Sequence, residues 1–214
     1  MNVVGYTLSG QDNGTYMFRD KSTLPTCSGC HCRLDFTATN SGYQLTSSSA
    51  DFSYTYDGQA IVSVAFKEIC ELNGYTEIKF GVFTKDPNHF HLLPQRQFEF
   101  DAARRETKFL DLCPICGRYE SIIGATPAFF KMNDPLADGV YRSDLLFASG
   151  NEKSPLILVG IATRKTFKDS KLRGLEFKEA YGFGGDVEEV FAAAKAKRQL
   201  SLKKKRKVDP ITNE

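Results

Sequence analysis

The sequence predicts an α+β fold, made mainly of antiparallel sheet with about three helices and stapled by two cysteine pairs. Short stretches in which apolar and polar residues alternate, as in half-buried strands, recur along the chain. Segments that open on capping residues and close on glycine interrupt them, as helices do. Two Cys-x-x-Cys pairs, Cys27/Cys30 and Cys113/Cys116, have the spacing of ligand knuckles and would join distant parts of the sheet.

The length of 214 residues is enough for one well-buried core and an appendage. Hydrophobic residues make up 41% and charged residues 25%, which are ordinary values for a globular protein and suggest neither a disordered nor a fibrous chain. We therefore expect one domain over residues 1–185, followed by a C-terminal helix and a basic tail over residues 186–214.

A β-hairpin is the first element expected. Its turn would be Asp12-Asn13-Gly14, because Asn-Gly readily takes the positive φ angles of a tight primed turn. The arms of this hairpin would carry Tyr6 and Leu8 on one side and Tyr16 and Phe18 on the other.

A helix flanked by strands is expected next. Residues 40–59 are rich in Ser, Thr, Gly and Asp, which predicts a loop with one short strand around Phe52–Tyr56. Ser63 can cap a helix over Val64–Leu72, and Asn73-Gly74 can end it. Alternating residues then predict a strand over 78–82 and, after a turn at 86–88, a second strand over His89–Phe100.

An internal repeat is one interpretation of the middle of the chain. A shift of 97 residues lays Val62–Phe80 over Val159–Phe177 without a gap. The alternative is that any capped amphipathic helix leading into a strand has this pattern. The sequence leaves both interpretations open.

The last third mixes irregular and regular segments. Thr126–Asp144 contains two prolines and is expected to be irregular, whereas the apolar run Leu156–Val159 predicts a buried strand or the start of a helix. Asp186 can cap a final helix over Val187–Gln199. The basic run Lys203–Lys207 would then extend into solvent.

No segment predicts membrane insertion. The longest apolar stretch, Pro155–Ala162, is far shorter than the roughly 20 residues that cross a bilayer, and no basic-then-apolar leader opens the chain. We expect a cytoplasmic protein without a membrane partner. In that reducing compartment paired cysteines favour metal binding over disulfides.

Charge divides the chain into two parts. Eight of the 28 basic residues and two of the 26 acidic ones lie in residues 195–214, which leaves 20 bases against 24 acids, a net charge of −4, in residues 1–194. The body is thus mildly acidic, and any affinity for nucleic acid would lie in the tail. Lys203–Val208 also has the composition of a short nuclear import signal; an ordinary solvated tail is the alternative.

The two cysteine pairs predict one structural zinc ion (Zn²⁺). Each pair lets a tight turn point two thiolates at one tetrahedral ion, so Cys27, Cys30, Cys113 and Cys116 supply the four ligands of a closed site. The 82 residues between Cys30 and Cys113 do not forbid this, because the entropy of closing a loop grows only logarithmically with length. The main alternative is a redox Cys-x-x-Cys, which needs no second copy.

Other cysteines and histidines leave the ligand count open. His31 or Cys32 could replace one of the four ligands or belong to no site, and Cys70 is expected to be a small buried apolar residue. His89 and His91 would share one face of a strand, where a metal or acid-base site is conceivable, but no nucleophile or carboxylate pair accompanies them.

The sequence lacks the motifs that would predict an enzyme. It contains no phosphate-binding glycine-rich loop, no nucleophile elbow and no HExxH motif. We therefore predict neither catalytic residues nor a small-molecule substrate. An enzyme built on an open metal site would need a vacant ligand position and a nearby base.

Three segments and the two knuckles carry a resemblance. Gly139–Leu145, Gly150–Pro155 and Leu172–Phe177, together with the paired Cys-x-x-Cys motifs, resemble the double-CxxC immunity proteins of bacterial polymorphic toxin systems. The resemblance implies a protein without enzymatic activity that binds a cognate protein toxin and neutralises it. The alternative is a zinc-containing protein that binds nucleic acid through its basic C-terminal tail.

Overall fold

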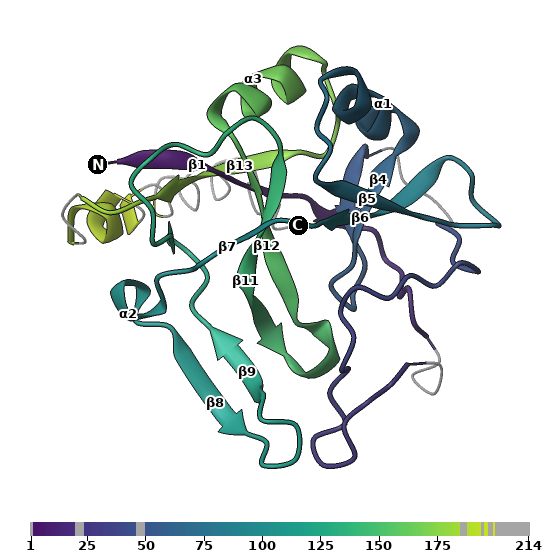
Figure 1. Ribbon diagram of the computed structural model, residues 1–214, viewed down its shortest axis with the longest axis horizontal. Coiled ribbons are helices and arrows are strands. Elements are labelled where there is room, and N and C mark those ends of the chain that lie inside the picture. Colours follow the sequence, from purple (N-terminus) through teal and green to yellow (C-terminus); the bar gives the residue numbers. More distant parts are fainter. Residues whose placement is uncertain are drawn as a thin grey trace, which may run out of the picture.

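Two mainly antiparallel sheets form the body of the protein (Figure 1). The computed structural model describes residues 2–19, 24–45, 50–184, 188–193, 195–196 and 199. The eight-stranded sheet has the order β10 (Ala128–Phe129), β13 (Glu176–Tyr181), β1 (Val3–Ser9), β12 (Ser154–Val159), β11 (Val140–Ser149), β9 (Tyr119–Ile123) and β8 (Lys108–Leu112), and β7 (Gln97–Phe98) pairs with β11. The five-stranded sheet has the order β2 (Gln11–Asp12), β3 (Phe52–Tyr54), β4 (Ala60–Ser63), β6 (His89–Pro94) and β5 (Ile78–Val82).

Short helical segments lie between strands: α1 (Val64–Leu72), α2 (Ala102–Arg105), α3 (Ile161–Asp169) and a 3₁₀ turn, η2 (Gly150–Glu152). Helix α1 has the expected bounds and caps. The Ser63 hydroxyl accepts a hydrogen bond from the Phe66 N–H, and Gly74 has a φ of 68° just after the helix. The predicted α+β class with mainly antiparallel sheet is confirmed.

Two segments of the chain repeat the same topology. Strands β4 and β5 flank α1 in sequence, and β6 lies between them, antiparallel to both. Strands β12 and β13 flank α3, and β1 lies between them, antiparallel to both. The shift of 97 residues carries the bounds of α1 onto those of α3. The topology therefore favours the internal repeat, with β1 taking in the second unit the place that β6 takes in the first.

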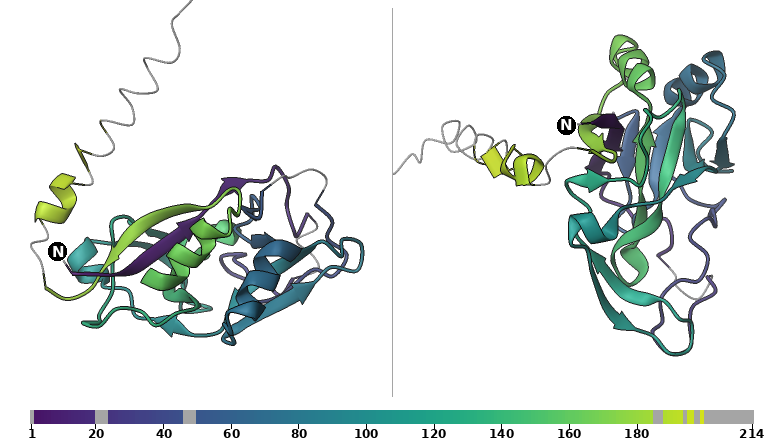
Figure 2. Two further views of the ribbon diagram at one scale, coloured as in Figure 1. Left: turned by 90° about the horizontal axis from the view of Figure 1, so that it is seen from above. Right: turned by 60° about the vertical axis from the view of Figure 1, so that its left-hand side comes forward.

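The two units share one hydrophobic core. Figure 2 shows α1 and α3 side by side, and the rings of Phe66 and Phe167 lie 4.8 Å apart between them. Both phenylalanines are almost fully buried, in a cluster that contains residues of both sheets. This cluster contains Leu8, Phe52, Ala60, Val62, Phe66, Cys70, Leu92, Val140, Ile157, Val159 and Phe167.

The predicted N-terminal hairpin is wrong. Strand β1 pairs with β12 and β13 instead of with residues 16–18, which form no strand. Gly14 has a φ of 76°, but the chain follows β3 on both sides of it: Asn13 N donates to Tyr54 O at 2.8 Å, and Thr15 O accepts from Tyr56 N at 2.8 Å. Distant apolar strands cover both edges of β1, and a local turn signal cannot reveal such partners.

Other expectations need smaller corrections. The strand expected over His89–Phe100 is split into β6 and β7, because Pro94 has no N–H with which to continue a ladder. Its hairpin with β5 is confirmed, as are the short strand β3 and the buried strand β12. The stretch 126–144 is less irregular than expected, since it holds β10 and the start of β11.

The C-terminal helix is described in part. Residues 188–193 are helical, and the buried side chain of Val190 packs with Phe129 and Tyr181. The predicted cap Asp186 and the basic run 203–207 lie outside the described residues. None of the helices in the described ranges combines the length and apolar character that crossing a membrane requires.

Candidate metal centre

Four cysteine sulfurs from two distant segments meet in one cluster. The Sγ atoms of Cys27, Cys30, Cys113 and Cys116 all lie within 4.8 Å of one another. Cys27 Sγ is 3.7 Å from Cys113 Sγ, and Cys30 Sγ is 3.7 Å from Cys116 Sγ. Figure 1 shows why: the turn between β8 and β9 and the loop that carries the first pair lie side by side at the bottom of the view. The structure thus joins the four predicted ligand residues.

The spacing of the sulfurs fits a tetrahedral ion. Zinc–thiolate bonds of about 2.3 Å at tetrahedral angles place neighbouring sulfurs about 3.8 Å apart. The two 3.7 Å separations match this value. The remaining sulfur pairs are no more than 4.8 Å apart, so these sulfurs would have to move only slightly to reach it. The cysteine tetrad is close enough to hold one metal ion, and four sulfurs would complete its coordination.

Both knuckles have the same backbone. In the first, Cys27 N donates to Cys32 O at 2.9 Å and His31 N donates to Cys27 O at 2.9 Å. In the second, the N–H of the first cysteine donates to Arg118 O at 3.0 Å, and Gly117 N donates back to that cysteine's carbonyl at 2.9 Å. The residue after each second cysteine has a left-handed φ, 57° at His31 and 67° at Gly117. The local sequence therefore folds the same way twice.

Backbone N–H groups favour the thiolate form of one cysteine in each knuckle. The N–H groups of Cys30 and Gly29 lower the pKa of Cys27. Those of Cys116 and Ile115 lower the pKa of Cys113 to about 6. A metal binds the thiolate rather than the thiol, so these donors favour the ligand form of two of the four sulfurs.

The two knuckles also pack against each other. A Cβ atom at Gly29 would lie 2.7 Å from Cδ1 of Ile115, so a side chain between the first two cysteines would displace the end of the Ile115 side chain. Arg118 Nη1 donates to Leu34 O at 2.7 Å, which links the strand after the second knuckle to the segment after the first. The cluster therefore joins residues 24–45 to the β8–β9 ribbon, which we define as residues 108–123.

Cys32, His31 and Cys70 lie outside the sulfur cluster. Cys32 is buried, and burial raises the pKa of its thiol to about 11. The exposed His31 forms the knuckle turn. Cys70 belongs to the hydrophobic core, where burial raises the pKa of its thiol to about 12, as expected for a small buried apolar residue.

His89 and His91 have separate polar partners. His89 Nδ1 lies 3.0 Å from both carboxylate oxygens of Asp86, and His91 Nδ1 lies 2.9 Å from Thr39 Oγ1. Burial lowers the pKa of His91 to about 3. Throughout the described ranges, the cysteine tetrad is the one cluster of three or more Cys, His, Asp or Glu side chains that is suited to a metal.

Sequence reasoning missed an exposed apolar surface on the ribbon beside the sulfurs. We call it the ribbon patch and define it as Leu110, Leu112, Ile115, Tyr119 and Ile123. Neither β8 nor β9 contains a buried residue, and Ile115 is 64% exposed. The sequence held a signal in the apolar residues on either side of Cys113, but residues that alternate in this way are expected to face a core.

The chain matches no protein-family model and no curated protein.

Proposed function

We propose that the cysteine tetrad holds a structural zinc ion. The closed arrangement of four sulfurs carries this proposal, because catalytic zinc keeps one position open for water or substrate. An ion at this point would fasten the β8–β9 ribbon to residues 24–45. Its contribution would be to the folded shape of the surface around it, and its ligands leave no place for a reacting molecule.

We further propose that the protein is a cytoplasmic, non-enzymatic binding protein, namely an immunity protein that neutralises a cognate toxin. The resemblance of the two knuckles to double-CxxC immunity proteins supports this. So does the ribbon patch, because exposed apolar side chains gathered beside a rigid staple are typical of protein-binding surfaces. The net charge of −4 in residues 1–194 suits a basic partner, such as a nuclease toxin.

The test uses the product of the gene beside the one that encodes this chain. We expect that product to kill a bacterial host when expressed alone, and the purified full-length chain to bind it and restore growth. Replacing Leu112 by Glu should weaken binding by roughly tenfold or more, since charging a buried apolar contact is costly. Leu72→Glu is the matched control, because Leu72 is also exposed, at 87%, but lies on α1.

Several outcomes would contradict the proposal. If neighbouring products are harmless, or if a toxic one kills equally with and without this chain, the protein is not an immunity protein. If Leu112→Glu and Leu72→Glu weaken binding equally, the ribbon patch is not the contact surface. Metal analysis that finds less than one zinc ion per chain would contradict the proposed structural zinc site, whatever the result with the toxin.

A second candidate function rests on the eight basic residues of positions 195–214. A zinc-containing nucleic-acid-binding protein would bind a 20-base-pair DNA duplex with an affinity that falls steeply with salt, because binding releases counterions. Removing residues 195–208 should then abolish the binding. Binding that is absent, or that survives the truncation, would exclude this function.

A further inference from the structure

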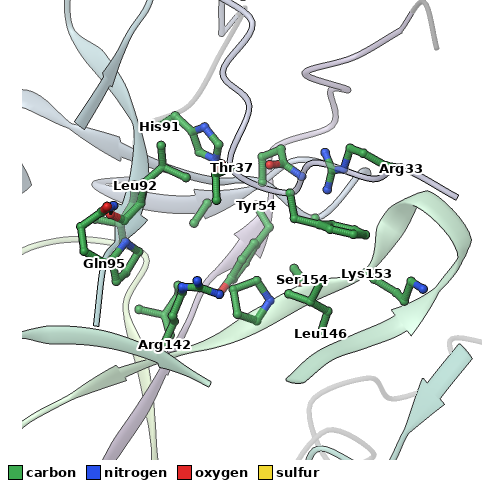
Figure 3. Close-up of a pocket in the computed structure, with 18 residues that line it drawn as sticks. Arg33, Thr37, Tyr54, His91, Leu92, Gln95, Arg142, Leu146, Lys153 and Ser154 are labelled. Carbon is green, nitrogen blue, oxygen red and sulfur yellow. Dashed lines mark hydrogen bonds between the residues drawn. The ribbon is translucent and has the colours of Figure 1, made fainter. Parts of the chain in front are cut away.

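A cavity lies between the two sheets, next to the segment that follows the first knuckle (Figure 3). Its walls come from β3, β4 and β6 of the five-stranded sheet, from β11 and β12 of the eight-stranded sheet, and from residues 33–37. The volume is about 80 Å³. This is room for roughly five water molecules, or for an oxyanion with one or two carbons.

Arg33 places a buried positive charge at this cavity. Its side chain is 2% exposed, and its guanidinium carbon lies 4.7 Å from the centre of the Phe36 ring and 5.7 Å from that of Phe18. Within the described residues its guanidinium makes no hydrogen bond and no ion pair, and its buried Nε is without a partner. A buried cation without an anionic partner is costly, so this arrangement points to a missing anion.

The two acidic residues whose charges act on Arg33, Asp57 and Asp35, already accept other hydrogen bonds. The carboxylate oxygens of Asp57 accept hydrogen bonds from Met17 N at 2.9 Å and Phe18 N at 3.0 Å. Asp35 Oδ1 accepts from the N–H and the hydroxyl of Thr37, both at 2.8 Å. These carboxylates raise the pKa of Arg33 only in part, and burial lowers it overall.

The lining of the cavity is positive and lacks acids. The 18 lining residues include Arg33, Arg142 and Lys153 but no Asp or Glu. Figure 3 shows Arg33 and Arg142 on opposite sides of the cavity, with Tyr54 between them. The ammonium group of Lys153 donates to Tyr119 O and is therefore already bonded elsewhere. Two guanidinium groups thus remain to attract an anion, within a body whose net charge is negative.

Apolar side chains make up much of the remaining wall. Phe36, Leu146, Pro155 and Ile157 face the same space. A carboxylate on a short alkyl group suits this combination, because its two oxygens match the guanidinium fork and its carbon atoms meet the apolar wall. Phosphate has no carbon atoms and would leave the apolar wall without a matching contact.

We propose that this cavity binds the carboxylate of a small organic acid, with the Arg33 guanidinium as its anchor. Arg142 adds a second positive charge on the opposite wall. The site is independent of the proposed toxin binding and uses residues outside the sulfur cluster. Because Arg33 follows the first knuckle directly, and its N–H donates to Asn151 Oδ1 at 2.6 Å, the fold holds the anchor in place from two sides.

The test compares sodium acetate with its neutral counterpart acetamide. Both are titrated into the metal-loaded, full-length protein in chloride-free buffer, while NMR follows the Arg33 Nε–H and the backbone amides of Thr37 and Gln59. We expect saturable shifts with acetate, and none with acetamide or inorganic phosphate. Shifts that do not saturate, equal shifts with acetate and acetamide, or saturation by phosphate alone would overturn the proposal.

Substitutions locate the charge that matters. Arg33→Gln should weaken acetate binding by at least about tenfold, since a charge-assisted hydrogen bond to a buried partner is lost. Should Arg33→Gln fail to fold, Arg142→Gln provides the second test, with a loss of roughly two- to fivefold from the more distant charge. The control is Arg173→Gln, because Arg173 is 67% exposed beside Asp51. Unchanged acetate affinity in both cavity variants would overturn the assignment.

Discussion

The two knuckles have the same backbone hydrogen bonds, but they differ in how closely the surrounding residues pack against the body of the protein. The first, around Cys27 and Cys30, lies in a segment whose next side chains, Cys32 and Arg33, are buried in the body. The second, residues 113–118, lies at the tip of a ribbon whose strands contain no buried residue. The ribbon joins the sheet where Ala148 and Ser149 of β11 pair with β9, and Lys153 reaches Tyr119 O. An ion between the knuckles would therefore stabilise the ribbon more than the first segment.

Loss of a cysteine ligand should have the largest effect. Cys113→Ser removes one thiolate, and we expect the chain to lose its metal and more than about 3 kcal/mol of unfolding free energy, since structural zinc contributes apparent energies of about 10 to 16 kcal/mol in small peptides. Metal analysis and denaturant unfolding measure the two losses. Hydrogen exchange should show faster exchange over residues 108–123 than over 27–34.

Cys32→Ala is the control for that experiment. Cys32 is a buried thiol next to the first knuckle but outside the sulfur cluster, so this variant should keep one metal ion per chain. If Cys32→Ala loses the metal, the ligand set differs from the tetrad. If hydrogen exchange in Cys113→Ser accelerates as much over residues 27–34 as over residues 108–123, the metal stabilises both segments equally, and the difference in their packing has no effect.

The second largest effect should come from acid, which we expect to release the metal and loosen the β8–β9 ribbon. Metal binding requires thiolates, so affinity falls as protons compete for the sulfurs. The folded pKa of Cys113, about 6, is below the ordinary thiol value of 9.0, so the stability it contributes is present above pH 9 and is lost as pH falls through 6. Titration from pH 8 to pH 5 with a zinc-sensitive dye should show zinc release that increases as the pH falls. Release that is independent of pH would contradict thiolate ligation.

The turn residues give the smallest effects, with opposite signs. Gly117→Ala should cost about 1 kcal/mol of unfolding free energy, because a left-handed φ strains any residue that has a Cβ. His31→Gly should stabilise by about 0.5 to 1 kcal/mol, because it relieves the same strain in the first knuckle. Denaturant unfolding of the metal-loaded proteins measures both. Equal signs for the two changes would mean that the knuckle turns are not equivalent.

Short sequence signals predicted those features of the structure that contacts between neighbouring residues determine. The spacing of the cysteines predicted both knuckles, because the hydrogen bonds that shape each one lie within six residues. Ser63 and Gly74 predicted the bounds of α1 for the same reason. That the two knuckles meet was predicted from coordination chemistry rather than from a sequence pattern, since four thiolates suit one ion.

Contacts between distant residues were not predictable in this way. The partners of β1 lie at residues 154–159 and 176–181, and no turn signal at Asn13-Gly14 could disclose them. Arg33 looked like an ordinary residue after a knuckle, because the walls of its cavity come from five strands far apart in the sequence. The ribbon patch was hidden because apolar residues in alternating strands are expected to face a core.

Because β1 lies between β12 and β13, it can pair only late in synthesis, after both of these strands have been made. The unit of β3, β4, α1, β5 and β6 is complete once residue 94 has emerged from the ribosome, and its strands are close neighbours in sequence. Strand β1 is made earlier, yet both of its edges stay unpaired until residues 154–181 follow. During translation, this nascent strand is therefore the segment most exposed to wrong pairing, and chaperones would be expected to engage it first.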